Sequence, residues 1–118
     1  LPTLRNTFKV FYNNIFFKLS SQTKYSVDVL KEQCVKNECI PIIGFIPNSQ
    51  YWEPNPLTDN FRREIKKYTL EKDVKFIDFT EEIEAYGDKA YALKGSHMSP
   101  TGYKLISEKI KINLSNLN

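Results

Sequence analysis

Two short, mainly apolar segments constrain the fold of this chain more than any other feature of its sequence. The first is Ile-Pro-Ile-Ile-Gly-Phe-Ile at residues 40–46, and the second is Val-Lys-Phe-Ile-Asp-Phe at residues 74–79. Runs of this length and character are typical of strands buried on both faces of a parallel sheet. Pro41 is compatible with the first residues of such a strand. The sequence therefore predicts two short parallel strands.

Helical patterns fill most of the chain around these strands. Two helices are expected before the first strand, at residues 3–20 and about 25–37, with a break at 20–23. A third helix is expected from a Thr58 or Asp59 cap to Leu70. After the second strand we expect a helical turn at 80–86 and a loop at 87–95. The side chains expected to face inward are Val27, Leu30, Cys34, Phe61, Ile65 and Tyr68. Helices that join short apolar strands imply crossover connections, so the expected fold class is α/β with about four helices.

The last helix has the clearest start signal. Ser99 is placed to cap it, Pro100 occupies its first position, and Gly102 in its first turn lets another group pack closely. Its expected buried stripe consists of Tyr103, Ile106 and Ile110. We expect residues 113–118 to form a tail.

Composition narrows the class of protein. The 118 residues suit one domain, and the net charge of +3 comes from lysines scattered among acids, so no nucleic-acid footprint is expected. No signal peptide or membrane-spanning run is expected either. Cys34 and Cys39 match neither a redox nor a zinc motif, and two interpretations stay open: partly buried thiols or a disulfide. The cellular compartment is undetermined.

His97 is the residue best placed for chemistry. In α/β sheets functional residues follow the carboxyl ends of the strands, and residues 47–49, 78–80 and the loop that ends at His97 should reach that edge. A neutral imidazole accepts a proton at physiological pH, and a position beside a helix cap suits a general base. Asp78 is expected to cap its own turn.

The segment His97-Met98-Ser99-Pro100-Thr101-Gly102-Tyr103 resembles the last block of the SGNH/GDSL-type hydrolases, in which the catalytic histidine precedes Ser-Pro and Gly plus an aromatic residue. The strands at 42–47 and 74–79 are similar to the last two strands of that family. The resemblance covers about residues 25–112. It implies part of a flavodoxin-like three-layer sandwich over residues 23–112, preceded by an aromatic-rich amphipathic helix at 1–22.

The resemblance implies an esterase, lipase, deacetylase or O-acyltransferase that acts on an acyl ester of a small molecule or glycan, without cofactor or metal. His97 matches the family's general base for a serine nucleophile. The family's Gly-Asp-Ser and Gly-x-Asn-Asp blocks are absent, so we expect this chain alone to be inactive. The serine would come from outside this chain, in an N-terminal half that is missing here, and that half or another copy of the chain would complete the sheet.

The chain also departs from the family beside the histidine. Lys94 stands where the family usually has an aspartate that orients the imidazole. Three alternatives stay open: a backbone carbonyl orients His97, a more distant acid such as Asp88 does so, or the chain is an inactive relative. A lysine at this position disfavours the imidazolium.

Other segments have two interpretations each. Asn48, Tyr51 and Trp52 follow the first strand and would either line a substrate pocket or anchor their loop. The basic, Phe-rich helix at 1–22 would pack in a core or interface, or lie on a membrane surface. The main alternative function is a non-enzymatic α/β module that pairs with itself or a partner, because two strands do not form a stable sheet alone. A nucleotide-binding domain ranks last, because there is no Gly-rich phosphate loop.

Overall fold

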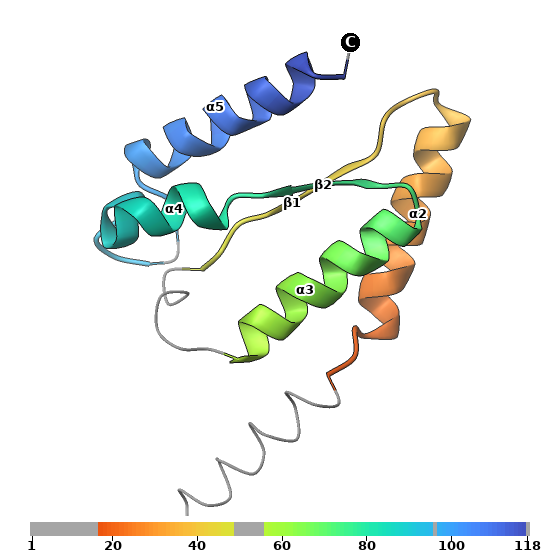
Figure 1. Cartoon of the computed structure of the whole chain (residues 1–118), viewed down its shortest axis with the longest axis horizontal. Helices are drawn as coiled ribbons and strands as arrows, with labels where there is room; N and C mark the ends of the chain where they lie inside the picture. Colours follow the sequence, from red (N-terminus) through yellow and green to blue (C-terminus); the bar gives the residue numbers. More distant parts are fainter. Residues whose placement is uncertain (1–16, 49–55, 96, 118) are drawn as a thin grey trace, which may run out of the picture. The chain divides into compact units, whose positions relative to one another are not determined.

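The computed structural model describes residues 17–48, 56–95 and 97–117, with the side chains of residues 56–58 left aside. This part of the chain is mixed α/β and mostly helical (Figure 1). Its elements are α2 (Ser21–Lys36), β1 (Ile42–Phe45), α3 (Pro56–Glu71), β2 (Lys75–Asp78), α4 (Thr80–Tyr86), the 3-10 helix η1 (Gly87–Ala90) and α5 (Pro100–Ser115). The expected α/β class with about four helices is confirmed for the described residues.

The two strands pair as a parallel sheet, as predicted (Figure 1). The Lys75 amide donates to the Pro41 carbonyl and the Phe79 amide to the Phe45 carbonyl, each at 3.0 Å. Each strand has four residues and is shorter than the apolar segment that contains it. The two hydrogen bonds flank β2 and fix the register of the pair.

The prediction that the first strand is buried on both faces is wrong. Ile42, Ile43 and Phe45 are only half-buried, and Ile40 and Ile46 beside the strand are about half exposed. The physical reason is the size of the sheet, because two strands bring too few neighbours to cover both faces in the described part of the chain.

The chain divides into two compact units, residues 1–43 with 54–76 and residues 44–53 with 77–118. In the first unit, α2 and α3 enclose a small apolar core. Its buried members are Leu19, Val27, Ile65 and Val74, with Phe17, Leu30, Ile43, Tyr68 and Phe76 packed against them. The predicted inward positions Val27, Leu30, Cys34, Ile65 and Tyr68 are buried or half-buried, whereas Phe61 is 36% exposed.

Helix α2 begins at Ser21, earlier than expected. The Ser20 hydroxyl accepts a hydrogen bond from the Thr23 amide at 3.1 Å, so the polar stretch taken for a break is the helix cap itself. Helix α3 likewise begins at Pro56 rather than at a Thr58 or Asp59 cap. The second error arises because a polar residue inside the first turn of a helix resembles a cap in sequence.

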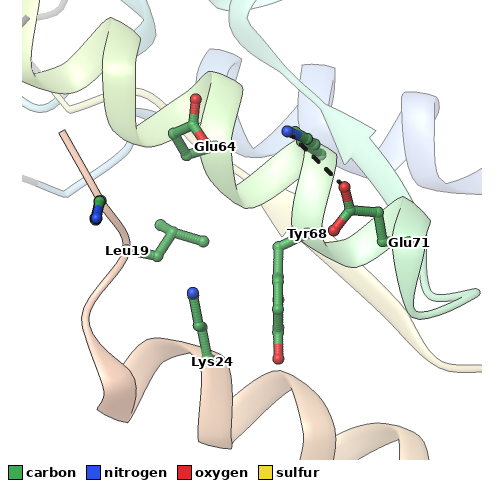
Figure 2. Close-up of a pocket in the computed structure, with 7 residues that line it drawn as sticks. Leu19, Lys24, Glu64, Tyr68 and Glu71 are labelled. Atoms are coloured by element: carbon green, nitrogen blue, oxygen red, sulfur yellow. Dashed lines mark ion pairs between the residues drawn. The ribbon is translucent and has the colours of Figure 1, made fainter. Parts of the chain in front are cut away.

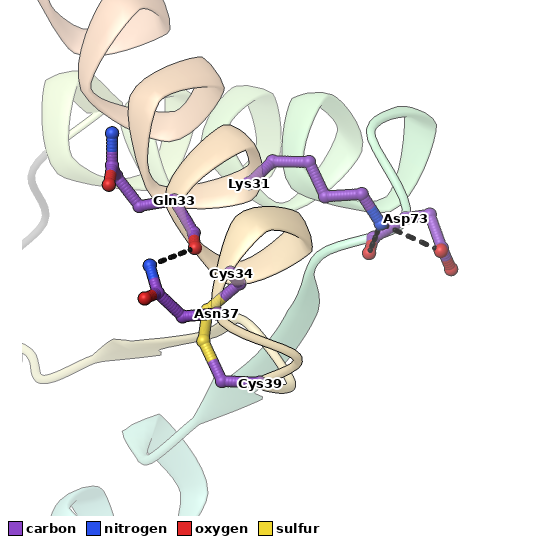
Figure 3. Close-up of a disulfide and its surroundings, with 6 residues drawn as sticks. All are labelled: Lys31, Gln33, Cys34, Asn37, Cys39 and Asp73. Carbon is purple, nitrogen blue, oxygen red and sulfur yellow. Dashed lines mark hydrogen bonds and ion pairs between the residues drawn. A yellow bond between two sulfur atoms is a disulfide. The ribbon is translucent and has the colours of Figure 1, made fainter.

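The end of α2 is closed by a disulfide between Cys34 and Cys39 (Figure 3). The sequence left this bridge open as one of two alternatives. Asn37 adds a second closure, because its side-chain amide donates to the Gln33 carbonyl at 2.8 Å. Glu38, between the two cysteines, has a positive φ of 53°. The disulfide and the Asn37 cap therefore hold a tight turn between α2 and β1.

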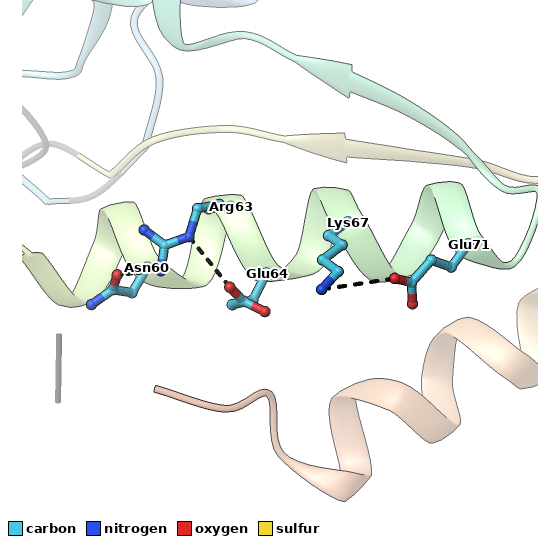
Figure 4. Close-up of polar contacts among 5 residues, drawn as sticks. All are labelled: Asn60, Arg63, Glu64, Lys67 and Glu71. Atoms are coloured by element: carbon cyan, nitrogen blue, oxygen red, sulfur yellow. Dashed lines mark hydrogen bonds and ion pairs between the residues drawn. The ribbon is translucent and has the colours of Figure 1, made fainter. Parts of the chain in front are cut away.

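A row of polar contacts runs along α3, on the side that faces the start of α2 (Figure 4). The Arg63 guanidinium donates to the Asn60 side chain at 2.7 Å and lies 3.3 Å from Glu64, and Lys67 lies 4.0 Å from Glu71. The Arg63, Lys67 and Glu71 side chains are more than half exposed, so these ion pairs contribute little to stability.

The second unit has its own core, formed by β2, α4, η1 and α5. Its buried members are Ile77, Phe79, Ile83, Ala90, Tyr91 and Ile106. On α5, Ile106 is buried as predicted, but Tyr103 is 58% exposed and Ile110 is 37% exposed, so two of the three stripe positions are wrong. The buried face is centred instead on Gly102 and Ile106, because the glycine lets the helix approach closely. Helix α5 also extends to Ser115, into the expected tail.

Candidate functional site

His97 lies on a short hairpin whose backbone is fixed on both sides. The Ala92 amide donates to the His97 carbonyl at 2.8 Å, and Tyr91 pairs with Met98 in an antiparallel bridge. The Ser99 amide then donates to the Ala90 carbonyl at 2.9 Å. These contacts hold the Cα of His97 between a β-bridge and a helix start.

The residues after His97 are explained by the start of α5. The Ser99 hydroxyl accepts from the Gly102 amide at 3.2 Å and donates to the Lys89 carbonyl at 2.6 Å. A Cβ on Gly102 would lie 2.1 Å from the Ala90 carbonyl oxygen, so only glycine fits there. The predicted roles of Ser99 as cap and Gly102 as a point of close approach are confirmed.

The His97 side chain, in contrast, has no structural role among the described residues. It is exposed, and within residues 17–48, 56–95 and 97–117 its imidazole makes no hydrogen bond or ion pair. The backbone therefore fixes the position of His97 and leaves its ring nitrogens available to a ligand or another chain segment.

Tyr91 connects this hairpin to the carboxyl end of β1. Its side chain is buried, and its hydroxyl donates to the Pro47 carbonyl. Burial raises the pKa of Tyr91 to about 12, which keeps the phenol protonated as a donor. The sequence analysis missed this residue, although a tyrosine between Ala90 and Ala92 is a recognisable signal for a buried aromatic ring with one polar atom.

The segments after both strands reach this region of the second unit. Asn48 follows Pro47 and is exposed, while Tyr51 and Trp52 lie outside the described residues. After β2, the Asp78 carboxylate accepts from the Thr80 amide at 3.0 Å, which confirms the expected capping role. The Thr80 hydroxyl is buried and has no hydrogen-bond partner in the described part of the chain.

The structure does not join His97 to either predicted neighbour. Asp88 is exposed in η1, and its backbone carbonyl accepts from the Tyr91 amide at 3.1 Å. In the part of the chain that the structure describes, the Asp88 carboxylate and the Lys94 ammonium make no bond with the imidazole. No described serine hydroxyl bonds to His97 either, and that of Ser99 is engaged by the helix cap.

A hollow of about 160 Å³ lies in the first unit, at the start of α2 and along α3 (Figure 2). Its lining residues are Lys18, Leu19, Lys24, Glu64, Lys67, Tyr68 and Glu71. Beside it, the Tyr68 hydroxyl donates to both Asp28 oxygens at 3.0 Å, and Lys72 lies 3.0 Å from the same carboxylate. The hydrogen bond from Lys72, followed by that from Tyr68, lowers the pKa of Asp28. The mixture of charges around the hollow does not select one kind of ligand.

Two classes of feature are missing from the residues that the structure describes. None of their helices is long and apolar enough to span a membrane, and no three His, Cys, Asp or Glu side chains gather as they would around a metal ion. Comparison of the sequence and the structure with family models, curated proteins and solved structures returned no match.

Proposed function

We propose that this chain is the histidine-bearing, C-terminal part of an SGNH-like ester hydrolase or O-acyltransferase, and that His97 is its general base. One observation carries the proposal. Ser99 and Gly102 of the resembling block have structural roles, whereas the imidazole of His97 is exposed and has none. An exposed imidazole without a structural role leaves its ring nitrogens available to accept a proton, which a general base requires.

The proposed reaction transfers an acyl group through a serine. The imidazole of His97 takes the proton of the serine hydroxyl as its oxygen attacks the acyl carbon, and returns it to the leaving alcohol oxygen. Water or a second alcohol then releases the acyl group, again with His97 as base. The proposed serine belongs to a segment N-terminal to this sequence. Asn48, Tyr51 and Trp52 are the proposed wall of the acyl-ester pocket.

A fluorophosphonate probe tests this proposal on a polypeptide that carries this sequence together with the segment upstream of it. We expect one serine to be labelled, and His97→Ala to abolish the labelling. Lys94→Asp restores the acid that the family has at this position, and we expect it to accelerate labelling. The matched control is Lys66→Ala, an exposed lysine on α3, which should change nothing. Undiminished labelling in His97→Ala would remove His97 from the mechanism.

A second candidate function is a non-enzymatic interaction module. It is favoured by α5, on which Tyr103, Ile110 and Leu114 are exposed along one stripe beside an open apolar groove. Exposed apolar helix faces of this kind are typical of interfaces. Sedimentation of the 118-residue chain separates the candidates, because a folded, stable monomer contradicts self-pairing.

A further inference from the structure

The tip of the hairpin that carries His97 presents an apolar side chain to solvent. Leu93 has a relative exposure of 105%, the highest of the large apolar side chains in the described residues, and it immediately follows the Ala92–His97 hydrogen bond. We propose that Leu93 and Lys94 form a contact site for an anionic lipid surface.

The part of the hairpin that supports Leu93 and Lys94 is held by backbone contacts. The Tyr91–Met98 bridge and the bond from the Ser99 amide to Ala90 hold its two sides together, and the buried Tyr91 ring anchors it in the core of the second unit. A leucine at the end of such a support loses little further conformational freedom when it inserts into a headgroup layer, so more of its transfer free energy contributes to binding.

The exposed lysines near the tip favour contact with an anionic surface. Lys94 lies beside Leu93 at the tip and Lys89 lies at its base next to Asp88, whereas Lys104 lies 3.9 Å from Glu108 and is ion-paired. Lys89 and Lys94 are exposed, and their ammonium groups make no ion pair with any described residue. Cations beside an exposed apolar residue are the usual composition of segments that bind anionic membranes.

The shape of the tip favours a lipid surface over an acidic protein. Protein interfaces are anchored mainly by Trp, Tyr and Arg in pockets of the partner, and the tip itself has none of these residues. A single protruding leucine flanked by lysine instead suits a soft headgroup layer that closes around it. The contact does not require His97 to be catalytic, so it extends the proposed function without resting on it.

Co-sedimentation of the 118-residue chain with vesicles tests the proposal. One set contains equal parts of phosphatidylglycerol and phosphatidylcholine, and the other contains phosphatidylcholine alone. We expect binding to the anionic set only, weakened by salt at about 0.5 M because exposed charges are screened. The double variant Leu93→Ser/Lys94→Ser should lower the partition coefficient at least about fivefold, the effect of one lysine at an anionic surface.

The matched control is Leu70→Ser/Lys66→Ser, which removes an exposed leucine and lysine from α3 and should bind as the wild type does. His97→Ala should also bind normally, which separates this result from any failure of the proposed catalysis. Equal binding to both vesicle sets, or no binding, overturns the proposal. So does binding that survives the double variant but is lost in Phe8→Ser/Phe11→Ser, because the N-terminal segment would then be the contact.

Discussion

The Tyr91 hydroxyl donates a hydrogen bond to the Pro47 carbonyl, forty-four residues earlier in the chain. This contact joins the chain that leaves β1 to the hairpin that carries His97. The two segments belong to the same compact unit and flank the region in which a substrate of the proposed enzyme would bind. The buried Tyr91 phenol therefore links the segment before Asn48 to the hairpin that carries His97.

Tyr91→Phe is expected to lower the free energy of unfolding by about 1–3 kcal/mol, because it leaves the Pro47 carbonyl without its donor. Urea denaturation measures this loss, with the exposed Tyr86→Phe as the control. Burial raises the pKa of Tyr91 from 10.0 to about 12, so its stabilising effect is complete below pH 10 and is lost as the pH rises toward 12. Absorbance titration should show one tyrosine that ionises at a higher pH than the others, and this transition should be missing in Tyr91→Phe.

Gly102→Ala is expected to destabilise the chain by roughly 3 kcal/mol, since the new methyl group would overlap the Ala90 carbonyl oxygen. Thermal or urea unfolding would show the change. Thr101→Ala, at the exposed neighbouring position, provides the comparison and should have almost no effect. A Gly102→Ala variant as stable as the wild type would contradict the close approach of α5 and η1.

His97→Ala should leave stability within about 0.5 kcal/mol of the wild type, because the side chain is exposed and unbonded within the described residues. Ser99→Ala should cost about 1 kcal/mol through loss of the helix cap. Parallel urea titrations of the two variants make this comparison. A large loss in His97→Ala would reveal a structural role for the imidazole and would weaken the proposal that it is a base.

Reduction of the Cys34–Cys39 bridge should lower stability by about 2 kcal/mol, the chain-entropy value for a loop this short. Unfolding with and without dithiothreitol measures the difference. In Cys39→Ser the reductant should have no effect, which controls for its action elsewhere. The loss should remain small, because Asn37 still caps α2 through the Gln33 carbonyl.

Lys72→Met should change how stability depends on pH in acid. The hydrogen bond from Lys72 lowers the pKa of Asp28 from its ordinary value of 3.8, so its contribution is present above that value and is lost as the pH falls through the lowered pKa. The advantage of the wild type over Lys72→Met should therefore be constant above about pH 5 and shrink as the pH falls below about 4. Lys66→Met is the control, and an advantage independent of pH would exclude this linkage.

The features that the sequence predicted correctly are local ones. The Ser99 cap and the positions of the two strands depend on neighbouring residues, and local patterns encode them directly. Tyr103 and Ile110 were assigned to the wrong face because the close approach at Gly102 rotates the buried side of α5 toward Ile106. The hydrogen bond between Tyr91 and Pro47 joins residues far apart in sequence. The spacing of apolar residues along the chain does not predict a contact of this kind.

The candidate site was predictable only in part. The exposed position of His97 before a helix cap follows from sequence, but the absence of a bond from Asp88 depends on the backbone path through η1. Within the resembling block, Ser99 and Gly102 maintain the junction of η1 and α5, whereas the His97 side chain is exposed and makes no hydrogen bond with the described residues.

The contact between Gly102 and Ala90 therefore has a consequence for descent. A lineage that lost its catalytic histidine would still need the glycine and the capping serine, because the junction of α5 with η1 fails without them. The roles of the serine and the glycine of the Ser-Pro-x-Gly segment are therefore structural and do not depend on an active site.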